Sequence, residues 1–137
     1  MNGIGTALIP LNLALLIFGC LIGLFVGAMP GLGSVNGVAI LIPITFIVPP
    51  TAAIIFLAAV YYGAMYGGAI SSIMLGIPGA STAVATVFDG RPLAQKGEAI
   101  TGLTAAAVGS FVGGTVSVIL FTLFAPPLAK VALAFNA

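Results

Sequence analysis

The chain has 137 residues, of which 61% are hydrophobic and 4% are charged, and its mean hydropathy is +1.35. This composition is typical of integral membrane proteins and excludes a soluble domain, because few side chains could hold a surface in water. Histidine is absent and the net charge is +1, so the commonest metal ligand and any basic patch for nucleic acid are both missing.

Residues 1–88 contain no Asp, Glu, Lys, Arg or His, and several stretches in the chain are long enough to cross a bilayer. A transmembrane helix needs about 20 mainly apolar residues. Leu11–Met29 is the first predicted span. Thr51–Ile77 and Ala99–Ala125 are longer, and we expect Pro126–Pro127 to end the last of them.

Two other apolar stretches are too short or too interrupted to be secure spans. Gly31–Val48 contains Pro43, and it is either a short kinked span or a half-helix that re-enters the membrane. Gly79–Phe88 is too short to cross and predicts a second half-helix, while Leu128–Ala137 resembles the start of one more helix. We therefore predict an all-α integral membrane protein with three to four transmembrane helices and two broken or re-entrant half-helices, in one membrane domain over residues 1–137.

Two Pro-Gly steps interrupt the apolar run, as P-G-L-G-S at Pro30–Ser34 and as P-G-A-S-T at Pro78–Thr82. In hydrocarbon an unpaired backbone group costs several kcal/mol, so a broken helix survives only where protein or a water-filled cavity satisfies it. Broken helices at membrane depth commonly form the binding sites of transporters.

The residue types at both breaks suit an anion such as a carboxylate. Glycine lets a ligand approach the backbone, and the helix that follows presents free N–H groups and the positive end of its dipole. The alternative is that both breaks are loops in which Ser34 and Ser81 cap helices, and the residues alone do not decide. The predicted substrate-binding residues are Pro30, Gly31, Gly33, Ser34, Asn36, Pro78, Gly79, Ser81 and Thr82.

Glycines inside the predicted spans recur every four residues, which places them on one helix face. Such faces let two backbones approach closely, and close contact supports helix association in lipid. The pattern predicts a tightly packed bundle but does not separate transporters from channels. The glycines concerned are Gly19, Gly23 and Gly27, then Gly63 and Gly67, then Gly109 and Gly113.

Tyrosine and cysteine add two smaller predictions. Tyr61, Tyr62 and Tyr66 lie near the middle of a predicted span, where they would bond within the bundle or line a cavity rather than anchor a membrane interface. Cys20 is the only cysteine, which excludes an intramolecular disulfide, and we interpret it as a buried structural thiol rather than a lipidation site.

The segment Asp89–Glu98 carries four of the five charges. We interpret it as a solvated connection between spans, and the alternative is an ion or proton relay. Arg91 and Lys96 favour a cytoplasmic location, although Lys130 then faces the opposite side. Three residues within the segment argue against its burial: Gly90, Pro92 and Gly97.

A series of motifs from about Gly19 to Pro127 resembles a known family. They are G-A-M-P-G-L-G followed by L-I-P-I-T-F, then Y-G-A-M-Y-G-G-A-I, then G-I-P-G-A-S-T-A-V-A-T-V-F-D-G-R-P-L-A-Q-K-G-E-A. In this order and spacing they are similar to the large membrane subunit of tripartite tricarboxylate transporters, the TctA type. The Pro-Gly motifs of that family fall here on Pro30, Gly31 and Gly33, and on Pro78 and Gly79.

The resemblance implies a bacterial inner-membrane secondary transporter that takes up carboxylates such as citrate, driven by an ion gradient of Na⁺ or H⁺. It also implies two partners, a small membrane subunit and a periplasmic solute-binding protein. Family members are several times longer and contain a second related half, so the chain resembles the N-terminal part of such a subunit, a partial transporter repeat. The alternative is a small self-assembling channel or structural membrane protein packed through its glycine faces.

An enzyme is not expected. No histidine is available to activate Ser71, Ser72 or Ser81, and no pair of acids is spaced for metal binding or acid–base catalysis. We therefore predict no catalytic residue, no metal site and no cofactor beyond a coupling cation.

Overall fold

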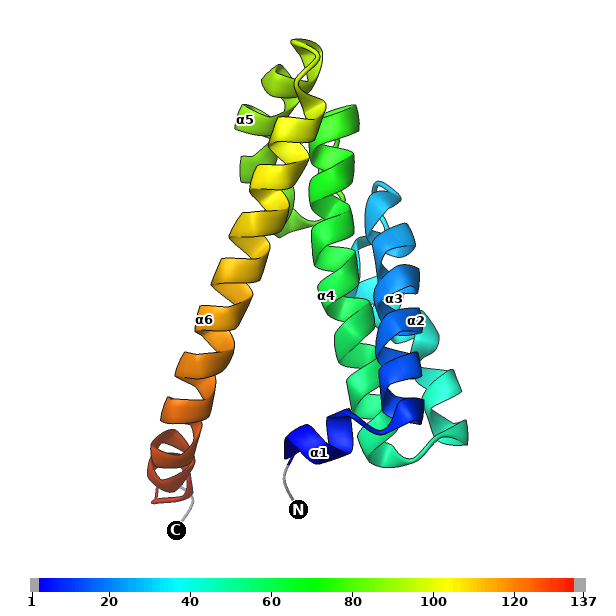
Figure 1. Cartoon of the computed structure of the whole chain (residues 1–137), viewed down its shortest axis with the longest axis vertical. Helices are drawn as coiled ribbons and strands as arrows, with labels where there is room; N and C mark the ends of the chain where they lie inside the picture. Colours follow the sequence, from blue (N-terminus) through cyan, green and yellow to red (C-terminus); the bar gives the residue numbers. More distant parts are fainter. Residues whose placement is uncertain (1–2, 135–137) are drawn as a thin grey trace. The chain divides into compact units, whose positions relative to one another are not determined.

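The computed structural model describes residues 3–134, and these residues form helices and no strand (Figure 1). After the short α1 (Gly3–Ala7), three helices are long and apolar enough to cross a membrane: α2 (Pro10–Ala28), α4 (Pro50–Leu75) and most of α6 (Ala99–Ala134). Both α2 and α4 begin and end within two residues of the predicted spans. The predicted all-α membrane fold is confirmed.

A shorter helical element follows each Pro-Gly step. The first consists of α3 (Gly33–Leu41) and the 3₁₀ helix η1 (Ile42–Ile47), which starts one residue before Pro43. Their combined length is about 26 Å at 1.5 and 2.0 Å per residue, less than the roughly 30 Å hydrocarbon core of a bilayer. The second consists of η2 (Ser81–Ala83) and α5 (Val84–Gln95).

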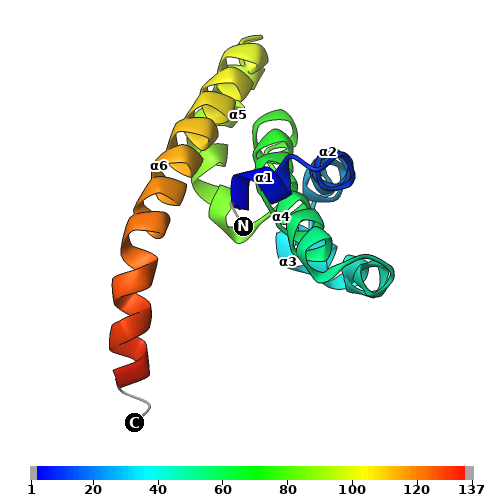
Figure 2. The ribbon, with the colours of Figure 1, turned by 60° about the horizontal axis from the view of Figure 1, so that its bottom comes forward.

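The chain divides into two compact units, one that ends at Thr104 and one that begins at Ala105. The main contact of the first unit is between α2 and α4, which lie side by side in both views (Figures 1 and 2). Helix α4 supplies most of the buried apolar side chains, including Phe56, Val60 and Ile73. The second unit is the remainder of α6.

Glycines on both helices make the contact between α2 and α4 close. A Cβ atom on Gly23 would lie 2.9 Å from the backbone nitrogen of Ala64, and one on Gly67 would lie 2.8 Å from that of Ala28. Gly19, Gly27 and Gly63 face the opposite backbone in the same way. The first two predicted glycine faces are therefore confirmed, whereas Gly109 and Gly113 have no atom within 4 Å and their packing stays a prediction.

Two linked predictions about the last span were wrong, its end at Pro126–Pro127 and the start of a separate helix at Leu128. Helix α6 continues through Pro126–Pro127 to Ala134. A proline inside a helix removes a backbone hydrogen bond and crowds the carbonyl group of the preceding turn, and a helix can accommodate both effects by bending. The last residues of the helix predicted at Leu128–Ala137 lie outside the described range.

The charged segment is also more regular than predicted, since α5 extends through Asp89 to Gln95. Gly90 is buried, and a Cβ atom there would lie 2.6 Å from Cγ1 of Ile73 on α4. The prediction that Gly90 opposes burial is therefore wrong, because this glycine permits close packing of α5 against α4. Asp89, Lys96 and Glu98 are exposed, as expected.

The glycine contact yields a first prediction. We expect Gly23→Ala to lower the thermal unfolding temperature of the protein in detergent, because a methyl group at Gly23 forces the backbones of α2 and α4 apart. Gly114→Ala is the matched control, because it lies on none of the predicted glycine faces, open space surrounds it, and alanine favours a helix interior by about 0.5–1 kcal/mol. Equal unfolding temperatures for the two variants would contradict the role of the glycine contact.

Candidate functional site

The first break lies between α2 and α3 and depends on two glycines. After α2 ends, the Met29 N–H donates to the carbonyl oxygen of Val26 at 3.2 Å, and the Leu32 N–H donates to that of Met29 at 3.4 Å. Gly31 and Gly33 have φ angles of +90° and +69°, in the left-handed region that side chains disfavour. The break therefore requires glycine at both positions, and α3 begins at the second of them.

The second break begins where α4 ends at Gly76, which has a φ of +72° and donates its N–H to the carbonyl oxygen of Ser72 at 3.1 Å. The chain then passes Gly68 of α4, where an added Cβ atom would lie 3.4 Å from the backbone nitrogen of Ala80. A Cβ atom on Gly79 would collide with the carbonyl oxygen of Gly27 and would lie 2.8 Å from Cα of Gly68. Gly79 is therefore wedged between the backbones of α2 and α4.

The two breaks meet at one hollow of about 340 Å³. Seven predicted site residues line it, four from the first break and three from the second: Gly31, Gly33, Ser34, Asn36, Pro78, Gly79 and Ser81. Three unpredicted residues complete the lining: Leu32, Val35 and Ala80. Pro30 and Thr82 do not line the hollow, although Thr82 contacts a residue beside it.

The lining offers backbone groups and no charged side chain. The helical elements that start at Gly33 and Ser81 have no side-chain cap. The first N–H groups of a helix have no partner within it, and they carry the positive end of its dipole. Neither the Ser34 nor the Ser81 hydroxyl caps a helix start, so the predicted capping is wrong, and the alternative that both breaks are loops between spans stays a prediction.

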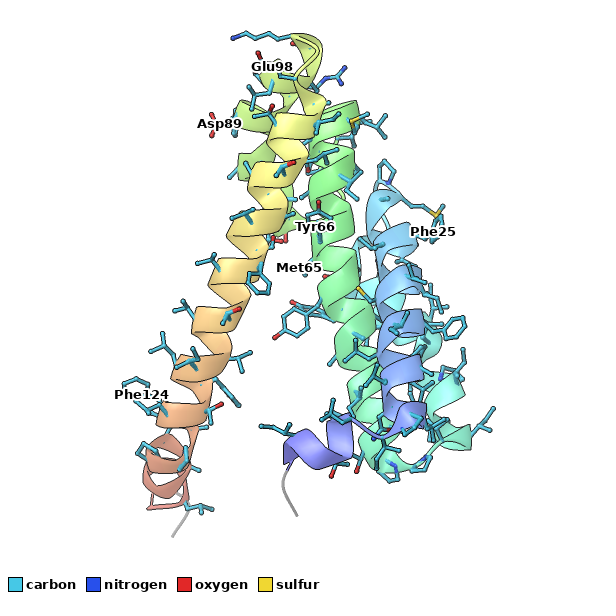
Figure 3. All side chains as sticks on the ribbon, in the orientation of Figure 1. Phe25, Met65, Tyr66, Asp89, Glu98 and Phe124 are labelled. Carbon is cyan, nitrogen blue, oxygen red and sulfur yellow. The ribbon has the colours of Figure 1, made fainter. Side chains whose placement is uncertain are left out.

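Two hydroxyl groups, one from each break, point to the same sulfur atom. Ser34, which is buried, donates from Oγ to Sδ of Met65 at 3.5 Å, and Thr82 donates from Oγ1 to the same sulfur at 3.7 Å. Met65 lies in the middle part of α4, where Figure 3 labels it. No sequence pattern singled out Met65, because a methionine in an apolar span carries no distinct signal.

A buried serine pair on α4 fixes the second break. Ser72 Oγ lies 2.8 Å from the carbonyl oxygen of Gly68 and 3.1 Å from that of Ala83, the last residue of η2. Ser71 donates to the same Gly68 oxygen at 3.0 Å, and a Cβ atom on Gly79 would lie 2.7 Å from its Oγ. This role of the two serines was not predicted from the sequence, although two adjacent hydroxyls in an apolar span are a usable signal.

Arg91 attaches α5 to the end of α4. Its guanidinium Nη1 donates to the carbonyl oxygen of Met74, and its side chain lies 3.3 Å from the position a Cβ atom would take on Gly76. A cation near the last carbonyls of a helix also interacts favourably with the helix dipole. Arg91 does not line the hollow, so in the structure it serves the fold beside the second break rather than the hollow itself.

The tyrosines divide into two groups. Tyr66 donates from its hydroxyl to the carbonyl oxygen of Leu103 at 3.3 Å, which confirms the predicted bond within the bundle. Tyr61 and Tyr62 form an edge-to-face pair with ring centroids 6.1 Å apart, and both are exposed. Tyr62 lines an apolar groove of about 350 Å³ with Cys20, a residue that is partly buried where a buried thiol was predicted.

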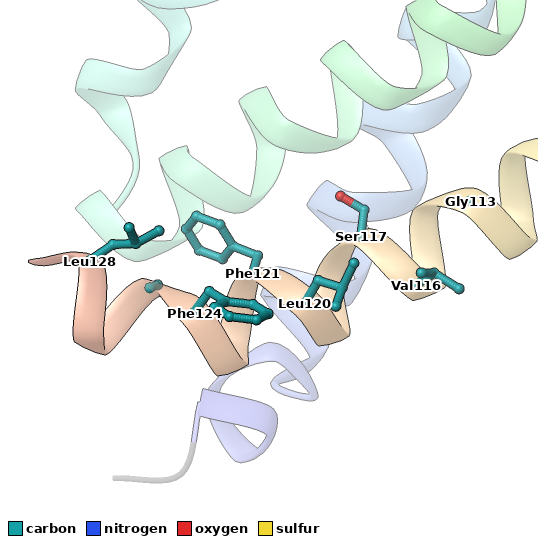
Figure 4. Close-up of a pocket in the computed structure, with 8 residues that line it drawn as sticks. Gly113, Val116, Ser117, Leu120, Phe121, Phe124 and Leu128 are labelled. Carbon is teal, nitrogen blue, oxygen red and sulfur yellow. The ribbon is translucent and has the colours of Figure 1, made fainter.

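A larger hollow of about 540 Å³ follows one face of α6 alone (Figure 4). Its side chains are apolar except for Ser117, and they include Leu120, Phe121 and Phe124. A surface of this composition suits lipid or another helix, and its one hydroxyl group, on Ser117, stands among apolar side chains on a single helix. The smaller hollow at the two breaks is therefore the candidate site.

Comparisons with known proteins agree with the resemblance noted from the motifs. A family model described as "Tripartite tricarboxylate transporter TctA family" matches residues 13–137. The chain is also similar to an Agrobacterium vitis protein described as "Uncharacterized 52.8 kDa protein in TAR-I ttuC' 3'region", with 44% identity over 135 residues. This match covers 98% of the chain but only 27% of the relative, so the chain spans about a quarter of that protein's length. No solved structure matches the chain.

The serine contact yields a second prediction. Ser72→Ala removes a hydroxyl whose single proton is shared between the carbonyl oxygens of Gly68 and Ala83, which we expect to destabilise the second break by about 0.5–1.5 kcal/mol. Amide hydrogen exchange in residues 76–83 should then become faster, while exchange in the middle of α2 stays unchanged. Ser110→Ala, at an exposed position of α6, is the control. Unchanged exchange in residues 76–83 would show that Ser72 does not hold this segment.

Proposed function

The chain belongs to the tripartite tricarboxylate transporter TctA family, and from this membership we propose that it is the N-terminal part of a secondary active carboxylate transporter subunit. The observation that carries the proposal is the meeting of both Pro-Gly breaks at one uncharged hollow. Transporters commonly place their substrate sites where two discontinuous helices face one another.

The hollow would hold a carboxylate chiefly through backbone N–H groups. We propose Gly31–Ser34 and Gly79–Thr82 as the two backbone segments, with the side chains of Ser34, Asn36 and Ser81 as further donors from the lining. Thr82 lies outside the lining and directly follows Ser81, and we propose its hydroxyl as a fourth donor. A hydrogen bond to a charged group contributes about 1.5–3 kcal/mol, so several of them can replace an arginine. The free N–H groups at a helix start add the favourable dipole.

The wider assignment rests on the family. We propose a location in the bacterial inner membrane, a small membrane subunit and a periplasmic solute-binding protein as partners, and a gradient of Na⁺ or H⁺ as the driving force. Alternating access moves one structural repeat against another around the site. Because the chain spans about a quarter of its relative, a longer subunit would supply the second repeat.

A matched pair of glycine variants tests the proposed site. Gly31 and Gly97 both have positive φ angles, of +90° and +84°, and neither has an atom within 4 Å of an added Cβ. Alanine therefore imposes similar backbone strain at both positions, but only Gly31 lines the hollow. In the transporter subunit that carries this sequence, we expect Gly31→Ala to weaken the apparent affinity for the transported carboxylate by roughly tenfold to a hundredfold.

The measurement is uptake of radiolabelled succinate, malate and citrate by cells that express the subunit with its two partners. Gly97→Ala should match the unmodified subunit in both affinity and rate. If Gly31→Ala reaches the membrane in normal amounts and transports with unchanged affinity and rate, the first break is only a loop. Failure of the unmodified subunit to take up any carboxylate would overturn the proposed function itself.

The orientation of the charged segment is a separate prediction. We propose that Asp89–Glu98 faces the cytoplasm, because Arg91 and Lys96 lie in it. Lys96 is exposed, so Lys96→Cys in a Cys20→Ser background provides an accessible thiol. A membrane-impermeant thiol reagent should label it in inside-out vesicles and not in whole cells. Rapid labelling in whole cells would place the segment outside.

A further inference from the structure

Met65 is the one described side chain that contacts hydroxyl groups from both breaks. Its sulfur accepts from Ser34, the second residue of α3, and from Thr82 in η2. Ser34 itself lines the hollow, and Thr82 directly follows Ser81, which also lines it. The sulfur atom therefore links the two sides of the hollow through one side chain of a third helix, α4.

The position of Met65 on α4 is well defined by its neighbours. Ala64 is buried against α2, where the backbones approach closely at Gly23 and Gly27. Gly67 and Gly68 face α2 and the second break one turn further along. The backbone of Met65 is thus held on a packed helix, whereas its unbranched side chain keeps three rotatable bonds and can follow small shifts of either break.

The chemistry of a thioether suits a temporary acceptor. A methionine sulfur accepts hydrogen bonds only weakly, whereas a carboxylate oxygen accepts them strongly. A hydroxyl that donates to a thioether is therefore oriented by a weak hydrogen bond. It can exchange this acceptor for an anionic oxygen at little cost in free energy. An apolar residue of the same size would leave both hydroxyls free to turn toward nearby carbonyl groups, and a strong acceptor would compete with the substrate.

We propose that Met65 is a positioning residue of the carboxylate site: its sulfur orients the hydroxyls of Ser34 and Thr82 and yields them to a substrate oxygen. This inference rests on the proposed function, because it assumes that the two hydroxyls bind substrate. It adds a residue that lies outside the lining of the hollow and that belongs to neither break.

The test is a cycle of variants in the transporter subunit, with uptake of the best radiolabelled carboxylate as the readout. Met65→Leu keeps the volume and removes the acceptor, so we expect the apparent KM to rise by roughly twofold to tenfold while the maximal rate is retained. Met74→Leu, at an exposed position of the same helix, is the control and should change neither value. KM does not depend on the amount of protein in the membrane. If Met65→Leu is poorly inserted, Met65→Ala provides a second variant that lacks the sulfur acceptor.

The decisive arm repeats Met65→Leu in a subunit that already carries Ser34→Ala and Thr82→Ala. If Met65 acts through the two hydroxyls, Met65→Leu has no further effect on KM in this background. The same rise in KM in both backgrounds, or no rise in either, overturns the inference. If Ser34→Ala and Thr82→Ala leave uptake unchanged, it is instead the proposed role of the hydroxyls in substrate binding that fails.

Discussion

The close backbone approach at glycine is the constraint on which the arrangement of the first unit depends. Gly23, Gly27 and Gly67 bring α2 and α4 together, and Gly27 and Gly68 then leave just enough room for Gly79. In lipid no hydrophobic force drives helices together, so short-range packing and hydrogen bonds must hold the unit. A single methyl group at these positions would displace the second break from the first.

In a chain without charge in its first 88 residues, this packing supplies the uncharged groups through which we propose that an anion binds. Each break leaves a helix start without a side-chain cap, and the glycine contacts bring both starts to one hollow. Ser72 and Arg91 attach the segment after α4 at two places, so the second break is held by α4 rather than by its own sequence. Gly31 and Gly79 are required for different reasons. Gly31 adopts a positive φ angle that other residues disfavour, whereas Gly79 leaves no room for a side chain between the backbones of α2 and α4.

Sequence alone predicted the spans and the two breaks well, because apolar length and Pro-Gly steps depend on local chemistry. It also predicted most residues of the hollow, although not that the two breaks would meet there. Met65 and the positioning role of Ser72 were missed, since both act through contacts between residues distant in the sequence. The prediction at Pro126 was wrong because a proline can end a helix or be accommodated inside it. The prediction at Gly90 was wrong because a glycine can mark an exposed turn or permit close helix packing. In both cases the neighbouring residues decide between the two outcomes.

We propose that backbone N–H groups from both breaks bind one carboxylate. The most direct measurement is a titration of the subunit, labelled with ¹⁵N-glycine, with the carboxylate that it transports. We expect the amide resonances of Gly31, Gly33 and Gly79 to shift together with a single dissociation constant, while that of Gly97 stays in place. Shifts confined to one break, or different dissociation constants for the two, would contradict it.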